Sequence, residues 1–523
     1  MKPPSDEIVI RSARAAIPSR DDAKPWILAA TILGSSLAFI DGTVVNVALP
    51  AIQANFRATV VDVQWVIESY GLFLAALILV GGSLGDLFGR RLIFLVGVSI
   101  FAVASAACGA ASSIHQLIMA RSIQGVGAAL LVPGSLAIIS SSFDEESRGR
   151  AIGTWSGFTA ITTAAGPVLG GWLVQHASWR WAFFINLPLA AAVIVISLWR
   201  IPESRSASAG LVDWLGGFLA TVGLGGLVAG FIESANLGWR SPLVLASLVV
   251  GVVCLGALVF FEARAASPML PLALFESRSF TGANLLTLLL YSALGVFFFL
   301  FPLNLIQVQG YSATATGAAI LPFILLIFVL SRWSGGLVAR YGPRAPLIVG
   351  PLIAALGFAL FAVPSVGGSY WKTFFPAVIV LGFGMAVTVA PLTTVVMNSV
   401  GQDRVGAASG INNAVARVAG VLAIAVLGIV MVNAFGRRLN HDLASLVPPS
   451  VLQQLQAQEI KLAGLPVPPD LDPTTKAAIH DSIGNAFVFG YRIVILICAA
   501  LSLASAAVAR LMIPKQPNPR LRL

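Results

Sequence analysis

Apolar runs of about twenty residues recur along nearly all of this 523-residue chain, and they constrain its fold more than any other feature. A helix of that length crosses the hydrocarbon core of a bilayer, whereas a soluble domain could not bury so much apolar surface. Hydrophobic residues make up 57% of the sequence and charged residues only 10%, against about 25% charged in soluble domains. We therefore predict an all-α polytopic membrane protein.

The runs predict fourteen membrane spans joined mostly by short loops, which favours a compact bundle of antiparallel neighbours. The spans are expected at residues 26–49, 64–84, 92–111, 114–140, 150–173, 180–200, 214–234, 241–262, 280–303, 314–338, 345–363, 371–396, 405–433 and 487–510. The exception is residues 434–486, a proline-containing stretch of mixed charge that we interpret as an external domain or hairpin.

The distribution of lysine and arginine predicts the orientation in the membrane. With a cytoplasmic N-terminus, the inside segments hold 20 of these residues and the outside loops hold 8, four of them in the long loop 434–486. Short cytoplasmic loops carry such an excess of positive charge. We expect cytoplasmic tails at 1–25 and 514–523 and a place in the cytoplasmic (inner) membrane. The net charge of +10 then reflects topology and contact with anionic lipid, and nucleic acid is not an expected partner.

The stretch Gly82–Arg91, which contains Asp86, Gly89 and Arg90, has a fainter copy at Gly335–Arg344, 253 positions later. A shift of 257 aligns further glycines, among them those at 125 and 382. The repeat divides the chain into two six-helix halves with two extra helices between them. The boundaries are 26–200 for the first half, 201–279 for the linker with the extra helices and 280–513 for the second half. Transporters are often built from repeated halves, with the substrate site between them.

The two halves differ in their charged residues. Asp86 aligns with Ala339, Arg90 with Pro343 and Arg121 with Val378. This asymmetry leads to the hypothesis that the first half carries the coupling chemistry and the second half contacts substrate.

Asp41, Glu68 and Arg121 are charged residues expected at one depth in the outer half of the membrane. An ion in hydrocarbon must be paired, wetted or neutral, so intramembrane acids are usually functional. A neighbouring arginine stabilises an ionised carboxylate and burial stabilises the neutral one, which leaves a movable proton. Each residue has an alternative interpretation. Asp41 could be a helix-end residue that hydrogen-bonds the backbone near Gly42, and Glu68 could lie among the lipid headgroups. Arg121 could extend its side chain to the outer membrane interface.

Two further sets of residues are candidates. The first is polar and is expected near a cavity: Gln124, Asn412, Asn413 and Arg417. The second lies along the predicted fifth span, where proline and small residues permit a bend and close packing: Gly166, Pro167, Gly170 and Gly171. Simple tight helix packing is the alternative for this second set.

Other chemistry finds no support in the sequence. No GxxxxGK[ST] segment is present, which argues against ATP as the energy source. The four histidines are scattered and the three cysteines lie unpaired in apolar runs, so neither a metal site nor a disulfide is expected. We predict no cofactor and no enzymatic activity.

Several motifs resemble those of the major facilitator superfamily. Gly82–Arg91 is similar to its loop signature, Arg121 to Gly127 to its fourth-helix motif, and Gly153 to Gly171 to the fifth-helix motif of antiporters. Asp41–Pro50 and Trp179–Pro188 look like the fourteen-span drug:proton antiporter family. The combination covers about residues 26–433 and the last helix.

The resemblance implies proton-driven multidrug efflux by alternating access. Asp41 would be the protonation site and Arg121 its modulator, with Asp86, Gly89 and Arg90 as a cytoplasmic latch. Gly166 and Pro167 would form a hinge and seal. Thr162 stands where the family's motif usually has glycine, and Glu68 stands where the family usually has an uncharged residue.

The partners implied are a small-molecule substrate, protons and the lipid bilayer, for a protein that functions as a monomer. A Gram-negative host would add a periplasmic adaptor as a candidate. A surplus of arginine in the membrane favours neutral or anionic amphipathic substrates. Two alternatives stay open: export of an endogenous metabolite, lipid or siderophore, and a non-transporting membrane sensor or scaffold.

Overall fold

The computed structural model describes residues 23–143, 145–205, 212–265, 268, 270–400 and 405–515, and every regular element within these ranges is a helix. The long helices of the first part are α2 (Lys24–Phe56), α3 (Val60–Phe88), α4 (Arg90–Ala110), α5 (Ile114–Ser142), α6 (Glu145–His176) and α8 (Asn186–Arg200), the last preceded by the short α7 (Trp181–Phe184). The middle of the chain forms α9 (Trp214–Leu237) and α10 (Pro242–Glu262).

The remaining helices follow the short 3₁₀ segment η2 (Leu272–Glu276). They are α11 (Arg278–Leu303) with the π-turn η3 (Asn304–Val308), α12 (Ala313–Gly335), α13 (Leu337–Tyr341), α14 (Arg344–Phe361), α15 (Tyr370–Thr373), α16 (Phe375–Asn398), α17 (Val405–Leu443), α18 (Pro449–Gln456), η5 (Glu459–Gly464) and α19 (Pro473–Met512). Thirteen helices of the described chain are long and apolar enough to cross a membrane. The 32-residue helix α6 lies where the fifth span was predicted.

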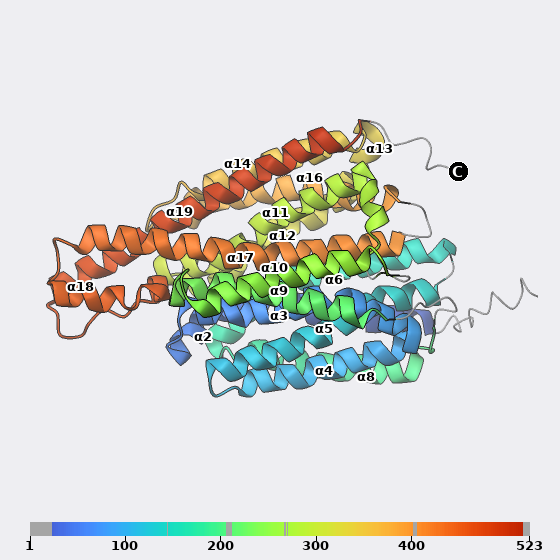
Figure 1. The fold of residues 1–523 in the computed structure, drawn as a ribbon, viewed down its shortest axis with the longest axis horizontal. Helices are drawn as coiled ribbons and strands as arrows, with labels where there is room; N and C mark the ends of the chain where they lie inside the picture. The colour runs from blue at the N-terminus through green and yellow to red at the C-terminus, as the bar shows by residue number, and fades with distance from the viewer. Residues whose placement is uncertain are drawn as a thin grey trace, which may run out of the picture.

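The long helices run side by side as one bundle (Figure 1). Helix α2 begins and α19 ends at the same end of this bundle, which we call the termini end. The opposite end carries α18 and is called the α18 end. Because successive long helices alternate in direction, the loop Gly82–Arg91 lies at the termini end and the start of α5 at the α18 end.

The hairpin formed by residues 434–486 is more helical than its composition indicated. Helix α17 continues to Leu443 and α19 starts at Pro473, so both pass well beyond the apolar spans predicted at 405–433 and 487–510. Their ends project from the bundle with α18 at the tip (Figure 1). Apolar length marks the part of a helix that suits the membrane, and it does not mark where the backbone stops being helical.

Contacts between the first six spans and the last six run mainly through α6 with α12 and α3 with α17. Small residues permit the first of these contacts. A Cβ atom at Gly171 would collide with the backbone of Ala313, and one at Gly317 would collide with the carbonyl of Pro167. Helices α9 and α10 pair with each other, and α9 also packs against α3 and α17.

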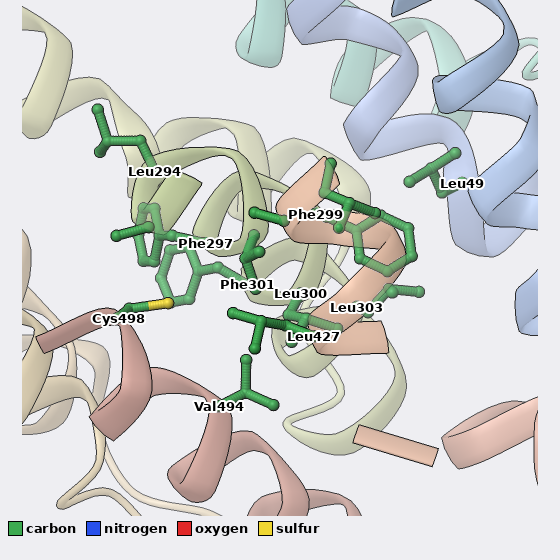
Figure 2. Packing of buried hydrophobic residues seen from close by; sticks show 14 of the residues in the cluster. Leu49, Leu294, Phe297, Phe299, Leu300, Phe301, Leu303, Leu427, Val494 and Cys498 are labelled. Atoms are coloured by element: carbon green, nitrogen blue, oxygen red, sulfur yellow. The ribbon is translucent and has the colours of Figure 1, made fainter. Parts of the chain in front are cut away.

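The last six spans enclose an aromatic core. Phe297 of α11 stacks on Phe301 at a ring-centroid distance of 4.9 Å and lies 4.8 Å from Phe361 of α14. Figure 2 shows Phe297 and Phe301 beside Cys498 and Val494 of α19. Aromatic pairs at such distances add stability beyond the area they bury.

Candidate functional site

The carboxylate of Asp41 lies at the centre of a buried polar cluster. Asp41 is the eighteenth residue of α2, about 26 Å from the start of the helix, and none of it is exposed. The alternative that Asp41 sits at a helix end, bonding nearby backbone, is therefore wrong. A carboxylate this deep needs partners, because an unpaired buried charge is costly.

Arg121 of α5 supplies the opposite charge. Its Nη1 lies 2.5 Å from Asp41 Oδ2 and donates to Gln124 Oε1 at 2.6 Å, while its Nε donates to the carbonyl of Val66 at 3.0 Å. The guanidinium also stacks over the ring of Tyr70, 4.2 Å from its centroid. Only 2% of the Arg121 side chain is exposed, so it is a buried ion-pair partner and does not snorkel to the interface.

Two amides complete the shell of Asp41. Gln124 donates to Asp41 Oδ1 at 2.9 Å and to Ser105 Oγ at 2.7 Å. Asn186, at the start of α8, donates to the same Asp41 oxygen at 3.2 Å and to Ser105 at 3.3 Å. Residues of α5 and α8 thus hold the carboxylate of α2, and Ser105 of α4 accepts from both amides. Gln124 was predicted to line a cavity, but its amide is fully buried and used inside the cluster.

This arrangement links the protonation of Asp41 to the position of Arg121. An arginine stays charged in proteins, so the pair is balanced only while Asp41 is ionised. Protonating Asp41 would leave a buried cation without a counter-charge, which is strongly unfavourable.

Glu68 lies outside this cluster, although it is at a similar depth. Its neighbours on the same face of α3 contact α17: Gln64 donates to the carbonyl of Ile424, and Gly71 lies against Val421. Glu68 is 0% exposed, and neither carboxylate oxygen has a hydrogen-bond partner among the residues that the structure describes. The expected grouping of Glu68 with Asp41 and Arg121 is not seen, because the side chain faces the seam between α3 and α17.

The stretch Gly82–Arg91 at the termini end is helical except at Gly89, and an ion pair joins the end of α3 to the start of α4. Arg90 donates to Asp86 Oδ1 from Nε at 2.9 Å and from Nη2 at 2.8 Å. Gly89 joins α3 to α4 with φ of 123°, a conformation that favours glycine. The side chain of Asp86 is 43% exposed, and that of Arg90 is 20% exposed.

A residue that sequence reasoning missed, Glu203, completes this loop. Its carboxylate accepts from the backbone N–H groups of Arg91 and Leu92, both at 3.1 Å, and so caps the start of α4. A helix N-terminus favours a carboxylate in this position. The Cβ of any larger residue at 89 would meet the Glu203 carboxyl at 2.7 Å. The only signal in the sequence was an acid directly after the sixth span.

The glycines of α6 contact both halves. Cβ atoms at Gly166 and Gly170 would collide with Thr43 and Val44 of α2, within three residues of Asp41. Gly171 instead approaches α12, as described above. Thr162, the departure from the antiporter motif, accepts a hydrogen bond from Ser36 of α2 at 3.0 Å. These contacts place α6 between the Asp41 cluster and the second half.

The predicted cavity residues on α17 are not gathered in one place. Asn412 donates to Thr287 at 2.7 Å and to Asn284 at 3.1 Å, both on α11. Asn413 is exposed and bonds only the carbonyl of Ser409. The Nε of Arg417 is buried without a hydrogen-bond partner in the described part of the chain. Arg417 lies on the same face of α17 as Val421, toward α3.

Three members of the Asp41 cluster were missed or left without a role. Asn186 was part of a motif, but no charge or spacing indicated that it reaches Asp41. Ser105 and Tyr70 carry no signal in the sequence, because a serine or tyrosine within an apolar span is common.

Similarity to known proteins identifies the family of this chain. The family model of the Major Facilitator Superfamily matches residues 31–214 and 202–424. The chain belongs to this superfamily: it is an integral membrane transporter of small molecules and not an enzyme.

Several relatives are resistance or export proteins. The multidrug resistance protein Stp of Mycobacterium tuberculosis is 36% identical over 439 residues, which covers 83% of this chain and 80% of the relative. The tetracenomycin C resistance and export protein of Streptomyces glaucescens is 32% identical over 508 residues, or 95% and 93% of the two chains. The puromycin resistance protein of Streptomyces alboniger is 36% identical over 440 residues, or 83% and 86%.

Solved structures agree on the fold. A bacterial homolog of the human lysosomal transporter Spinster is similar with a TM-score of 0.65 and 17% identity, over 96% of this chain and all of that chain. A D-xylose–proton symporter gives 0.60 and 13%, over 94% and 98%. At these identities the likeness concerns the fold alone.

Proposed function

We propose that this protein is a proton-coupled antiporter that exports amphipathic small molecules from the cytoplasm. The observation that carries the proposal is the Asp41 carboxylate, which is fully buried, paired with Arg121 and hydrogen-bonded by two amides. The similarity to a multidrug resistance protein and to a tetracenomycin C resistance and export protein supports the direction and the kind of substrate.

The transport cycle follows from the ion pair. Facing outward, Asp41 takes up a proton and the substrate leaves. Facing inward, Asp41 loses the proton, pairs again with Arg121 and a new substrate binds. Pro167 and the glycines of α6 form the hinge and seal, since this helix touches both α2 and α12. Asp86, Gly89 and Arg90 serve as the latch at the termini end, held in place by Glu203.

The substrate site lies between the two halves, in a region rich in apolar side chains. Arg417 is the charged residue of α17 that faces this seam, and its Nε has no partner within the described ranges. A cation in that position repels cationic compounds and attracts anionic ones. We therefore favour neutral or anionic amphipaths as substrates.

The topology belongs to the same proposal. The excess of lysine and arginine at the termini end supports a cytoplasmic position for both termini, in the inner membrane. The α18 end then faces outward. One chain contains both six-helix bundles, which supports a functional monomer. In a Gram-negative host, the projecting hairpin of α17 and α19 would be the surface available to a periplasmic adaptor.

The experiment is proton release from everted vesicles on adding substrate, with a panel of cationic, neutral and anionic compounds. The wild-type protein should couple substrate movement to proton release, and Asp41→Asn should abolish both when equal amounts of folded protein in the membrane are compared. Asp481→Asn is the matched control, because this exposed acid of α19 lies far along the chain from the cluster. Full coupled transport by Asp41→Asn would refute the assignment, and substrate binding without any proton movement in the wild type would favour a sensor.

A further inference from the structure

Helices α9 and α10 enclose, together with α3, α11 and α17, a cavity of about 420 Å³. Its wall includes Ala76 of α3, Ala220 of α9, Leu258 of α10, Leu285 of α11 and Ala414 of α17. The first half, the second half and the extra helix pair all contribute to this one space. Alanines on three of the helices leave room that larger side chains would fill.

The wall offers no free polar group to a ligand. Among the lining residues only Thr281 and Asn284 have polar side chains. Thr281 donates to the carbonyl of Phe275 at 2.6 Å, and Asn284 donates to the carbonyl of Phe280 at 2.9 Å while its oxygen accepts from Asn412. A compound with its own donors and acceptors would lose its water without compensation here. A hydrocarbon chain would lose nothing.

The cavity lies at the depth of one leaflet. Ala220 is six residues from the start of α9, about 9 Å along the helix, and Thr281 is one turn from the start of α11. Both helices start at the termini end. The surrounding solvent at that depth is lipid hydrocarbon, and α10 presents Val252 and Val253 to it with exposures of 63% and 62%.

Two exposed arginines stand at the level of the lipid headgroups beside the cavity. Arg278 is the first residue of α11, one turn from Thr281, and Arg264 follows the end of α10. Each uses one guanidinium nitrogen to donate to a backbone carbonyl, that of Leu511 or Phe260. Three acids lie at this end of the same helices. Asp213 and Glu262 accept from the backbone N–H groups of Gly216 and Leu270, and Glu276 is exposed, so the two arginines outnumber the acid among these exposed side chains. Basic groups beside a cavity between membrane helices attract anionic headgroups.

We propose that this cavity binds one acyl chain of an anionic phospholipid from the leaflet at the termini end. The bound chain touches α3 and α17, which lie on opposite sides of the seam between the halves. If the halves rock in alternating access, as proposed above, the cavity changes shape, and the lipid stabilises the state that holds it better. Binding of the chain itself does not depend on transport.

The test is native mass spectrometry of the full chain, purified in detergent and supplied with phosphatidylglycerol. We expect one retained phospholipid per chain. Ala220→Phe fills the cavity and should weaken retention at least about tenfold, equivalent to ~1.4 kcal/mol. Val253→Phe adds the same group on the lipid-facing side of α10 and should retain the lipid like the wild type. Ala414→Leu is a milder filling variant from another helix, for use if Ala220→Phe fails to fold.

Two outcomes would overturn the proposal. One is a wild-type protein that retains no phospholipid, or retains only detergent. The other is equal retention by the folded filling variants and Val253→Phe. Phosphatidylcholine should be retained less than phosphatidylglycerol, and equal retention would refute the role of the headgroup charge. None of these readouts involves transport, so a failure here is distinct from a failure of proton coupling.

Discussion

The centres of the two six-helix halves are built from equivalent positions but from opposite chemistry. In the alignment that relates the repeats, Asp41 corresponds to Leu294 and Ser105 to Phe358, by the shift of 253. In the first half these two positions hold the acid of the ion pair and the serine that accepts from both amides. In the second half they hold apolar side chains that are at most 8% exposed. The ring of Phe358 lies 6.1 Å from that of Phe297, and Leu294 belongs to the same cluster, as Figure 2 shows.

This scaffold therefore does not need charges at these positions in order to fold. The second half fills the same space with hydrocarbon, which generally stabilises a core as well as a buried ion pair does. The charges of the first half are therefore better explained by chemistry than by stability.

The largest expected effect comes from breaking the ion pair. Arg121→Val gives the first half the residue found at the equivalent position 378. It leaves the Asp41 carboxylate buried without a counter-charge, which should cost about 3–5 kcal/mol of unfolding free energy and abolish transport. Denaturant unfolding in detergent and vesicle transport measure the two effects.

The double variant Asp41→Leu with Arg121→Val is the control that sharpens this prediction. It removes both charges together, while Gln124 and Asn186 keep their hydrogen bonds to Ser105, and should recover most of the stability lost by Arg121→Val. Coupled transport should stay absent. A double variant as unstable as the single one would show that the charges serve folding, contrary to the comparison.

A second prediction concerns the aromatic centre. Phe297→Ala removes a fully buried ring and should cost about 3–5 kcal/mol. The number of protons exchanged per substrate should not change in the protein that remains folded. Phe383→Ala is the matched control, because that ring is 37% exposed and should cost much less. A change in proton stoichiometry in Phe297→Ala would place coupling chemistry in the second half as well.

The sequence predicted the all-helical fold, since apolar length alone marks helices that cross a membrane. The pairing of Asp41 with Arg121 could also be anticipated, because two isolated charges at one depth in hydrocarbon need each other. The partners Ser105, Asn186 and Tyr70 could not, because small polar and aromatic side chains cost little in a span and so leave no pattern.

The failures have a similar cause. The position of the charged residues along their helices was predicted well, but the side of the helix on which a side chain lies was not. Glu68 lies near the level of Arg121, yet the residues one turn before and after it face α17. Gln124 was expected at a cavity, yet its amide forms hydrogen bonds inside the Asp41 cluster. The end of α17 and the start of α19 were missed, because polar residues continue both helices beyond the apolar stretch.

A third, smaller effect is expected in the two repeated loops at the termini end. Asp86→Ala removes a partly exposed pair with Arg90, so stability should change by less than about 1 kcal/mol. Transport should slow about tenfold while substrate binding is kept, because the pair stabilises one arrangement of the loop. Arg344→Ala is the control in the second loop, where the guanidinium bonds only the carbonyl of Ile513 among described residues, and it should slow transport less. Lost binding in well-folded Asp86→Ala would contradict a latch.

The smallest expected effect separates the two buried acids of the first half. Asp41 has three side-chain partners, whereas neither oxygen of Glu68 has one among the described residues. An unpaired carboxyl packed between α3 and α17 is far cheaper when it carries its proton, and glutamine has nearly the same shape and no charge. Glu68→Gln should therefore change the unfolding free energy by less than about 1 kcal/mol and leave the proton count per substrate unchanged. Asp41→Asn, the same chemical change, should remove coupling altogether. If Glu68→Gln instead lost coupling while still binding substrate, coupling would involve the contact between α3 and α17 as well as the Asp41 cluster. The chemical difference between the two halves would then not be confined to the Asp41 cluster.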